Sequence, residues 1–166
     1  MKPETSVKVF IAGSRAISRL NAAIRERLDR IIQAGHEVVI GDANGADRAI
    51  QQYLADLHYK NVLVFCTGSK CRNNLGGWST MAVTPPTGVH GGFDFYAVKD
   101  REMAALATHG LMLWDGESRG TLTNVRNLIK HGKPVVVYFS PTKSFVTVRT
   151  QTEIDELRRP APTTSR

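Results

Sequence analysis

The sequence lacks any apolar run of about 18 residues, the length that a membrane-spanning helix requires. It therefore predicts no contact with a membrane. Residues 1–7 also lack the basic stretch and following apolar stretch of a secretory signal. Cysteine is scarce as well: Cys66 and Cys71 are the only two, which favours a reducing compartment over a disulfide framework. These absences together predict a cytoplasmic protein.

Two common nucleotide-binding motifs are also absent. No G-x-G-x-x-G follows the first apolar run, which argues against NAD or FAD bound in the usual way. No G-x-x-x-x-G-K-[ST] loop occurs, which excludes ATP hydrolysis by a P-loop enzyme. Cys66 and Cys71 lack a second Cys/His pair at zinc-site spacing, so we interpret Cys66 as a small core residue. The sequence thus predicts no cofactor and no metal.

The charge is unbalanced but scattered. The chain carries 22 Lys and Arg against 15 Asp and Glu, a formal net charge of +7. Such an excess can neutralise the phosphates of a nucleic acid. Nowhere, however, do the basic residues form the long run of like charges that is typical of a nucleic-acid-binding arm. We expect a solvated basic surface with some residues facing an anionic ligand, and nucleic-acid binding is the weaker alternative.

Apolar runs and helical patterns alternate along the chain. Runs typical of buried strands cover 7–12, 38–40, 62–65, 111–114 and 135–139, and apolar residues at helical spacing separate them. Strand–helix alternation requires a parallel sheet with helices on both faces. The sequence therefore predicts an α/β, Rossmann-like three-layer α/β/α fold with a mainly parallel sheet of five or more strands.

The remaining elements define one predicted domain, 1–159, followed by a disordered tail at 160–166. Residues 145–148 could add an edge strand, and Thr150 with Glu153 resembles a capping box for a last helix. The glycine-rich stretch at 67–95 is expected to be a long loop, with the next helix beginning near Tyr96. Loops of that length in compact domains are usually functional lids or binding loops.

Glycine-rich polar loops follow three of the predicted strands. In such sheets, ligands bind outside the carboxyl ends of the strands, where the strand order reverses, so we expect these loops to meet at one site. Glycine lets the backbone approach a phosphate, and hydroxyl, amide and guanidinium groups can donate to it. Each loop also has a structural alternative: a turn with a capping serine after the first strand, a carboxylate of Asp47 in the first turn of a helix after the second, and Thr121 as a helix cap after the fourth. The candidates are Gly13, Ser14 and Arg15 after the first strand, Gly41, Asp42, Asn44, Gly45 and Asp47 after the second, and Asp115, Ser118, Gly120 and Thr121 after the fourth.

The long loop contains a further candidate segment, 72–78. Trp78 offers an aromatic face for a base, Asn74 an amide for its edge and Arg72 a cation for a phosphate. Alternatively, Trp78 anchors an exposed loop to the core. Tyr96, one helical turn before Lys99, is expected to face the same ligand site.

Four stretches, in this order, resemble a known group: GSR, GDANGAD, KDREM and WDGESRGTLTN. They are similar to the SLOG superfamily, and to its small stand-alone bacterial branch in particular. That Rossmann-like group includes the LOG phosphoribohydrolases, the DNA-processing DprA domain and sensor domains for nucleotide-derived signals. The resemblance covers 7–139 and implies nucleotide binding in a fold that often forms homodimers.

The chain departs from the LOG hydrolases at two catalytic places. Their phosphate loop ends in G-T-x-x-E, whereas Asn124 holds the place of the glutamate here, and an amide cannot act as a general base. The hydrolases also carry an arginine where Lys99 or Asp100 stands in this chain, and lysine lacks the planar fork. The resemblance therefore implies ligand binding at Lys99 and Asn124 rather than hydrolysis by the LOG mechanism.

Three hypotheses of function follow. The first is a sensor or accessory domain that binds a nucleotide or a nucleotide-derived small molecule. The second is an N-glycoside hydrolase or transferase, similar to the nucleoside monophosphate phosphoribohydrolases, with Asp100 or Asp115 as the acidic group. The third and weakest is a nucleic-acid binder of the DNA-processing type.

Overall fold

A computed structural model describes residues 6–158, and over this range the chain forms one seven-stranded sheet with five helices. In chain order the elements are β1 (Lys8–Gly13), α1 (Ala22–Gln33), β2 (Glu37–Gly41), α2 (Ala46–Asp56), β3 (Val62–Thr67), β4 (Ser79–Val83), α3 (Gly92–Leu106), β5 (His109–Trp114), α4 (Arg119–Lys130), β6 (Val135–Phe139), β7 (Ser144–Val148) and α5 (Gln151–Arg158).

The strand order is β4-β3-β2-β1-β5-β6-β7. All neighbours are parallel except β6 and β7, which pair antiparallel at one edge. The chain first winds outward from β1 to β4 and then returns to the other side of β1 with β5. The order therefore reverses between β1 and β5, and the predicted mainly parallel Rossmann-like sheet is confirmed.

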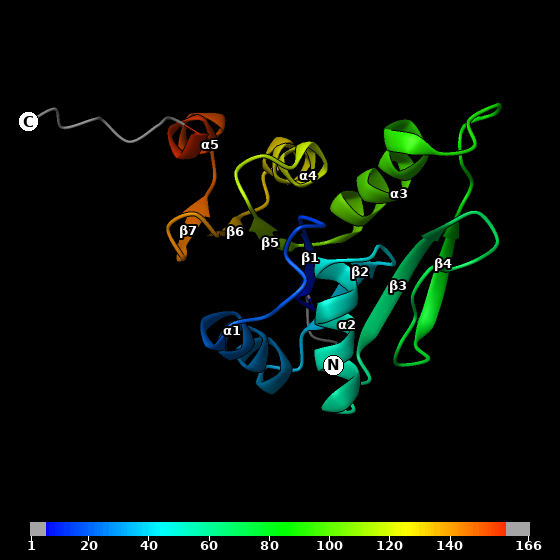
Figure 1. The fold of residues 1–166 in the computed structure, drawn as a ribbon, viewed down its shortest axis with the longest axis horizontal. Coiled ribbons are helices and arrows are strands. Elements are labelled where there is room, and N and C mark those ends of the chain that lie inside the picture. Colours follow the sequence, from blue (N-terminus) through cyan, green and yellow to red (C-terminus); the bar gives the residue numbers. More distant parts are fainter. Residues whose placement is uncertain (1–5, 159–166) are drawn as a thin grey trace, which may run out of the picture.

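Helices cover both faces of the sheet, as Figure 1 shows, with α1 and α2 on one face and α3, α4 and α5 on the other. Adjacent residues of β1 point to opposite faces, since Ile11 packs in the cluster with α1 and α2 while Phe10 packs in the cluster with α3 and α4. Both side chains are fully buried. Burial on both faces explains why the central strands read as continuous apolar runs.

The predicted long loop at 67–95 is wrong in two respects. Residues Ser79–Val83 form β4, which pairs parallel with β3, and α3 begins at Gly92 rather than near Tyr96. Four of the five residues of β4 are exposed and only residues 81–83 are apolar, so the sequence carries no long apolar run to reveal this edge strand.

Two other helices, α1 and α4, begin with a side-chain cap. Helix α1 begins at Ala22 with Asn21 as its cap, so a non-helical stretch separates it from the loop after β1. Helix α4 is capped by Ser118 and not by Thr121. At the other end of the chain, Thr150 and Glu153 form the predicted capping box, with Glu153 N donating to Thr150 Oγ1 over 3.3 Å and Thr150 N donating to Glu153 Oε1 over 3.1 Å.

The predicted tail, 160–166, lies outside the described residues. Among the helices within 6–158, none is both long and apolar enough to cross a membrane.

Candidate functional site

A cavity of about 660 Å³ opens at the carboxyl ends of the strands, over the point where the strand order reverses. This is the place that the topology predicts for a ligand. The loops after β1, β2 and β5 all contribute to it, together with one side of α3. The predicted site residues that line it are Gly13, Arg15, Asp47, Lys99, Asp100, Asp115, Ser118, Gly120, Thr121 and Asn124.

One wall of the cavity, which we call the α4 wall, is made by residues 115–124. Ser118 Oγ accepts hydrogen bonds from Thr121 N, over 3.4 Å, and from Thr121 Oγ1, over 3.1 Å. Ser118 thereby caps α4, whose first turn, with Gly120 and Thr121, borders the cavity. The free N–H groups and the positive dipole end of a helix start are suited to an anion.

Asp115 organises the turn that leads into this helix. Its Oδ1 accepts hydrogen bonds from Glu117 N, over 2.9 Å, and from Ser118 N, over 2.8 Å. Partial burial alone would raise the pKa of Asp115, but the hydrogen bonds from Ser118 and Glu117 outweigh it and hold that pKa below its usual value. Asp115 is therefore a stable carboxylate whose hydrogen bonds fix the turn.

Ser14, a predicted ligand contact, instead joins the two central strands. Its N–H donates to Leu113 O over 2.9 Å, and its Oγ accepts from Asp115 N over 3.2 Å. The residue is 1% exposed and does not line the cavity. It positions the turn of Asp115 rather than facing a ligand directly.

The opposite wall, which we call the charged wall, is lined by Asp47, Arg72, Lys99 and Asp100, and the buried Asp42 lies behind it, outside the cavity lining. Asp42 is 2% exposed and accepts from Arg72 twice, at Oδ2 from N over 2.8 Å and at Oδ1 from Nη2 over 2.9 Å. Lys99 Nζ lies 3.2 Å from Asp100 Oδ1 and 4.0 Å from Asp42 Oδ1. Buried charges are tolerated when they are paired in this way.

Gly41 makes room for this cluster. A Cβ atom at Gly41 would lie 2.7 Å from Lys99 Nζ and 2.8 Å from Asp47 Oδ2. Any larger residue would therefore displace the charged groups. Gly41 supports the site by leaving room for these side chains, and it does not itself line the cavity.

Asp47 carries the largest resolved shift in the site. Burial raises its pKa from 3.8 to about 6; the positive charge of Lys99 opposes this rise, while Asp100 and Asp42 add to it. Its Oδ2 accepts from Ala43 N over 3.1 Å, but its Oδ1 has no hydrogen-bond partner among the described residues. Asn124 Oδ1, also buried, is unpartnered in the same way. Two acceptors beside one cavity thus lack donors from residues 6–158.

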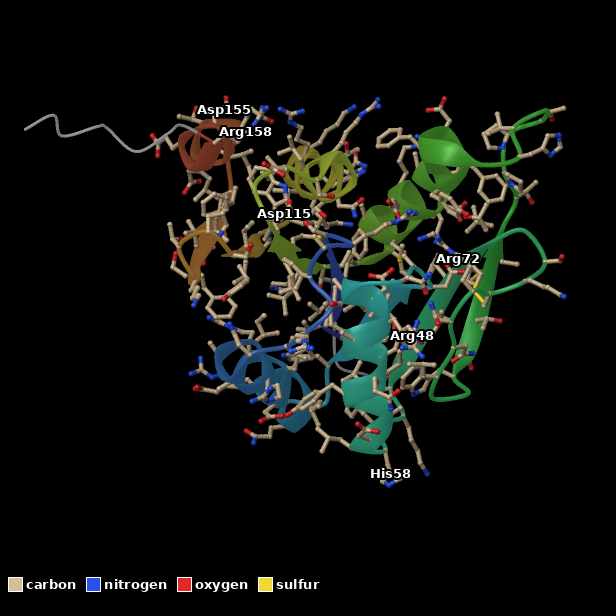
Figure 2. All side chains as sticks on the ribbon, viewed as in Figure 1. Arg48, His58, Arg72, Asp115, Asp155 and Arg158 are labelled. Atoms are coloured by element: carbon tan, nitrogen blue, oxygen red, sulfur yellow. A yellow bond between two sulfur atoms is a disulfide. The ribbon has the colours of Figure 1, made fainter. Side chains whose placement is uncertain are left out.

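Three further side chains line the cavity: Arg72 and Tyr96, which the sequence had suggested, and Phe93, which it had not. Arg72 lies with its guanidinium 4.1 Å from the centroid of the Tyr96 ring, and both residues line the cavity, as their positions in the sequence had suggested. Figure 2 shows Arg72 and Asp115 on different sides of this region. Phe93 also lines it, under the guanidinium of Arg119 at 3.9 Å, and was missed because 67–95 was interpreted as a loop.

Trp78 and Asn74 do not join the cavity. Trp78 is 9% exposed, packs in the core with α1 and α2, and donates from Nε1 to Tyr59 O over 2.7 Å. Asn74 Nδ2 donates to Trp78 O over 2.9 Å, and Trp78 N donates to Asn74 Oδ1 over 3.0 Å. This matches the alternative in which tryptophan anchors the connection to the core.

Asn44 and Gly45 also support the site from outside the cavity lining. Asn44 Oδ1 accepts from Asn73 Nδ2 over 2.9 Å. Gly45 has a φ of 80°, and a Cβ there would lie 2.4 Å from Arg15 O. Glycine at this position therefore allows the loop after β2 to pack against the loop after β1.

The cysteines differ from the prediction of a reduced pair. Cys66, at the end of β3, and Cys71 form a disulfide, with Cα atoms 5.0 Å apart. Asp42 lies beside them, with a carboxylate oxygen within 4.8 Å of both sulfur atoms. The pair is close in sequence as well as in space, so the bond closes a short loop and does not staple distant parts of the fold.

No protein-family model matches the chain, and no curated protein matches it. Among solved structures, the chain is similar to DNA processing protein A from Helicobacter pylori, whose single-stranded DNA binding mode that structure describes, with a TM-score of 0.60 and 17% sequence identity. The match covers 81% of this chain but 66% of the other, so this chain spans slightly less than two thirds of that protein. The chain therefore has a fold like that of DNA processing protein A, while membership of the SLOG superfamily stays a prediction.

Proposed function

We propose that the cavity binds a nucleotide or a nucleotide-derived small molecule, and that the protein acts as a sensor or accessory domain. The observation that carries this proposal is the meeting, around one cavity of about 660 Å³, of the start of α4 with Arg15, Arg72 and Lys99. Small-molecule sites commonly have volumes of about 300–1,000 Å³, so a nucleotide fits this size.

The two kinds of lining suit the two parts of a nucleotide. The first turn of α4 and the guanidinium of Arg15 can donate to a phosphate. Tyr96, Phe93 and Met103 offer aromatic and apolar surface to a base. A ligand with hydroxyl or amino groups could also donate to Oδ1 of Asp47 and Oδ1 of Asn124 after small side-chain movements, since neither atom has a hydrogen-bond partner among the described residues.

Titration with AMP by isothermal calorimetry tests this proposal. The double variant Arg15→Ala, Thr121→Ala should bind AMP at least about tenfold more weakly, because each lost charge-assisted hydrogen bond contributes about 1.5–3 kcal/mol. Arg48→Ala removes the same charge from an exposed position outside this cavity and should bind normally. Unchanged affinity in a folded double variant would contradict the proposed pocket.

Binding without turnover is part of the proposal. Asn124 is 4% exposed and lines the cavity, where the LOG hydrolases carry their glutamate. Positioned acid–base groups contribute about 10²–10⁴ in rate, so their absence should be plain in a long incubation with AMP, CMP, GMP or UMP. Repeated release of free base would favour the N-glycosidase alternative, with Asp100 or Asp115 as the first residue to mutate.

Single-stranded DNA is a second candidate ligand, favoured by the fold likeness to a protein that binds it and by the net charge of +7. Phosphate contacts along a strand make affinity fall steeply with salt, by a slope of about 0.7 for each contact. A mononucleotide in an enclosed site makes few such contacts. An oligodeoxythymidylate that binds with a steep salt slope and leaves AMP binding intact would identify a separate DNA surface.

A further inference from the structure

The connection between β3 and β4 begins with a loop that the Cys66–Cys71 disulfide closes. The two cysteines are separated by five positions, and the bond joins the end of β3 to the residue directly before Arg72. In Figure 2 the labelled Arg72 lies beside β3 and the yellow sulfur–sulfur bond lies close to it. The covalent link is thus placed next to a cavity residue.

The residues that follow the disulfide hold the charged wall together. Arg72 donates to Asp42 from both its backbone and its guanidinium, and the guanidinium lies over Tyr96. Asn73 Nδ2 donates to Asp42 O over 2.9 Å. The disulfide at Cys71 therefore also restrains the position of the Arg72 guanidinium at the cavity.

The second half of the same connection is anchored independently. Leu75 N donates to Gln51 Oε1 over 3.0 Å, and Trp78 is buried in the core. Gln51 itself is fully buried in α2. Asn73 is held as well, because Gln51 Nε2 donates to Asn73 O over 3.2 Å. Opening the disulfide would therefore release residues 68–72 while 73–78 stay in place.

We propose that Cys66–Cys71 is a reversible dithiol–disulfide site, and that its reduction weakens ligand binding by releasing Arg72 from Asp42. The binding effect rests on the proposed nucleotide site, whereas the release of Arg72 does not. The co-reactant is a dithiol reductant. Cys71 is partly exposed and Cys66 is 2% exposed, so attack falls on Cys71.

The reduction proceeds by thiol–disulfide exchange. One reductant thiolate forms a bond to Cys71 Sγ, and Cys66 Sγ leaves as a thiolate that takes up a proton. The second reductant thiolate then attacks the reductant sulfur of this mixed disulfide, and Cys71 Sγ leaves and is protonated. Two electrons and two protons pass to the protein, and the reductant ends as its own disulfide.

The first measurement determines whether the site exists and whether it controls Arg72. Intact mass after treatment with iodoacetamide should show no alkylated cysteine in untreated protein and two after dithiothreitol. Hydrogen exchange of the Arg72 amide should then become faster in the reduced protein, while the Leu75 amide and the amides of β1 and β5 keep their rates. Two free thiols in air-equilibrated protein, unchanged exchange at Arg72, or faster exchange throughout the sheet would each overturn the proposal.

The second measurement links the site to the ligand. AMP should bind about two- to tenfold more weakly to the reduced protein and to the double variant Cys66→Ser, Cys71→Ser than to the oxidised protein, because Arg72 must be ordered again on binding. In Arg72→Ala the oxidised and reduced forms should bind alike. If the oxidised wild type binds AMP and reduction changes nothing, the redox proposal is overturned; if the oxidised wild type binds no nucleotide, the proposed function fails instead.

Discussion

The two walls of the cavity are built in different ways. The α4 wall is a continuous stretch, 115–124, in which Asp115 and Ser118 bond to residues two or three positions away. The charged wall joins segments far apart in the chain, such as Asp42 and Arg72, which lie 30 positions apart. The first wall presents the first turn of a helix to the cavity, whereas the second has most of its charges paired within the protein. In the proposed function, the α4 wall binds the anionic part of the ligand and the charged wall shapes the rest of the pocket.

The largest expected effect is a difference in the free energy of unfolding between alanine substitutions at two glycines, Gly45 in the loop after β2 and Gly120 in the α4 wall. Gly45→Ala should lower the free energy of unfolding by about 4 kcal/mol, since it combines a left-handed backbone with a collision against the backbone of Arg15. Gly120→Ala should change it by less than about 0.5 kcal/mol, because a Cβ there meets no atom within 4 Å. Urea unfolding measures both, and equal losses would contradict the comparison.

The buried carboxylate of the charged wall should make stability depend on pH. The pKa of Asp47 is raised from 3.8 to about 6, so the folded state favours the protonated form. The contribution of Asp47 to stability should therefore fall as the pH rises from about 4 to 6 and stay low above that, a total of about 3 kcal/mol. Asp47→Asn keeps an acceptor for Ala43 N and removes the charge.

The difference in unfolding free energy between Asp47→Asn and the wild type isolates this effect. The variant should be the more stable protein at pH 8, and its advantage should shrink as the pH falls below 6. Titrating groups that do not interact with Asp47 cancel in the difference. A constant difference across pH 4 to 8 would show that Asp47 is not the group responsible.

The smallest of the three effects tests whether the α4 wall contacts the ligand. Gly120→Ala keeps the fold but places a methyl group on a residue that lines the cavity. AMP affinity should fall about tenfold, which corresponds to about 1.4 kcal/mol. The matched control is Gly91→Ala, because a Cβ at Gly91 meets no atom within 4 Å and the residue lies outside the cavity lining. This variant should bind AMP normally. Gly132→Ala is unsuitable because the φ of Gly132 is 72°.

The same difference between local and distant contacts explains what the sequence could predict. The strands at the centre of the sheet are apolar because both of their faces are buried, and their alternation with helices predicted the parallel sheet. The loop 115–121 was predicted as part of the site because its glycines, its hydroxyls and its helix start lie next to one another in the chain.

Features that depend on tertiary contacts were not predictable in this way. Strand β4 is mostly exposed and is defined by its pairing with β3, so its composition resembles a loop. The sequence around Trp78 looks the same whether its ring stacks on a base or packs in the core. The hydrogen bond from Trp78 Nε1 to the backbone carbonyl of Tyr59 depends on the fold. The disulfide also depends on the fold, because composition alone favoured two free thiols.

The most direct test of the central claim is an NMR titration of the isotope-labelled protein with AMP, following backbone amide shifts. Saturable shifts should appear at Arg15, Gly120 and Thr121, around the cavity, and be absent at Arg48 and His58, which Figure 2 places away from Asp115. A spectrum that stays unchanged at millimolar AMP, or that changes only around Arg48 and His58, would contradict the nucleotide site at the start of α4.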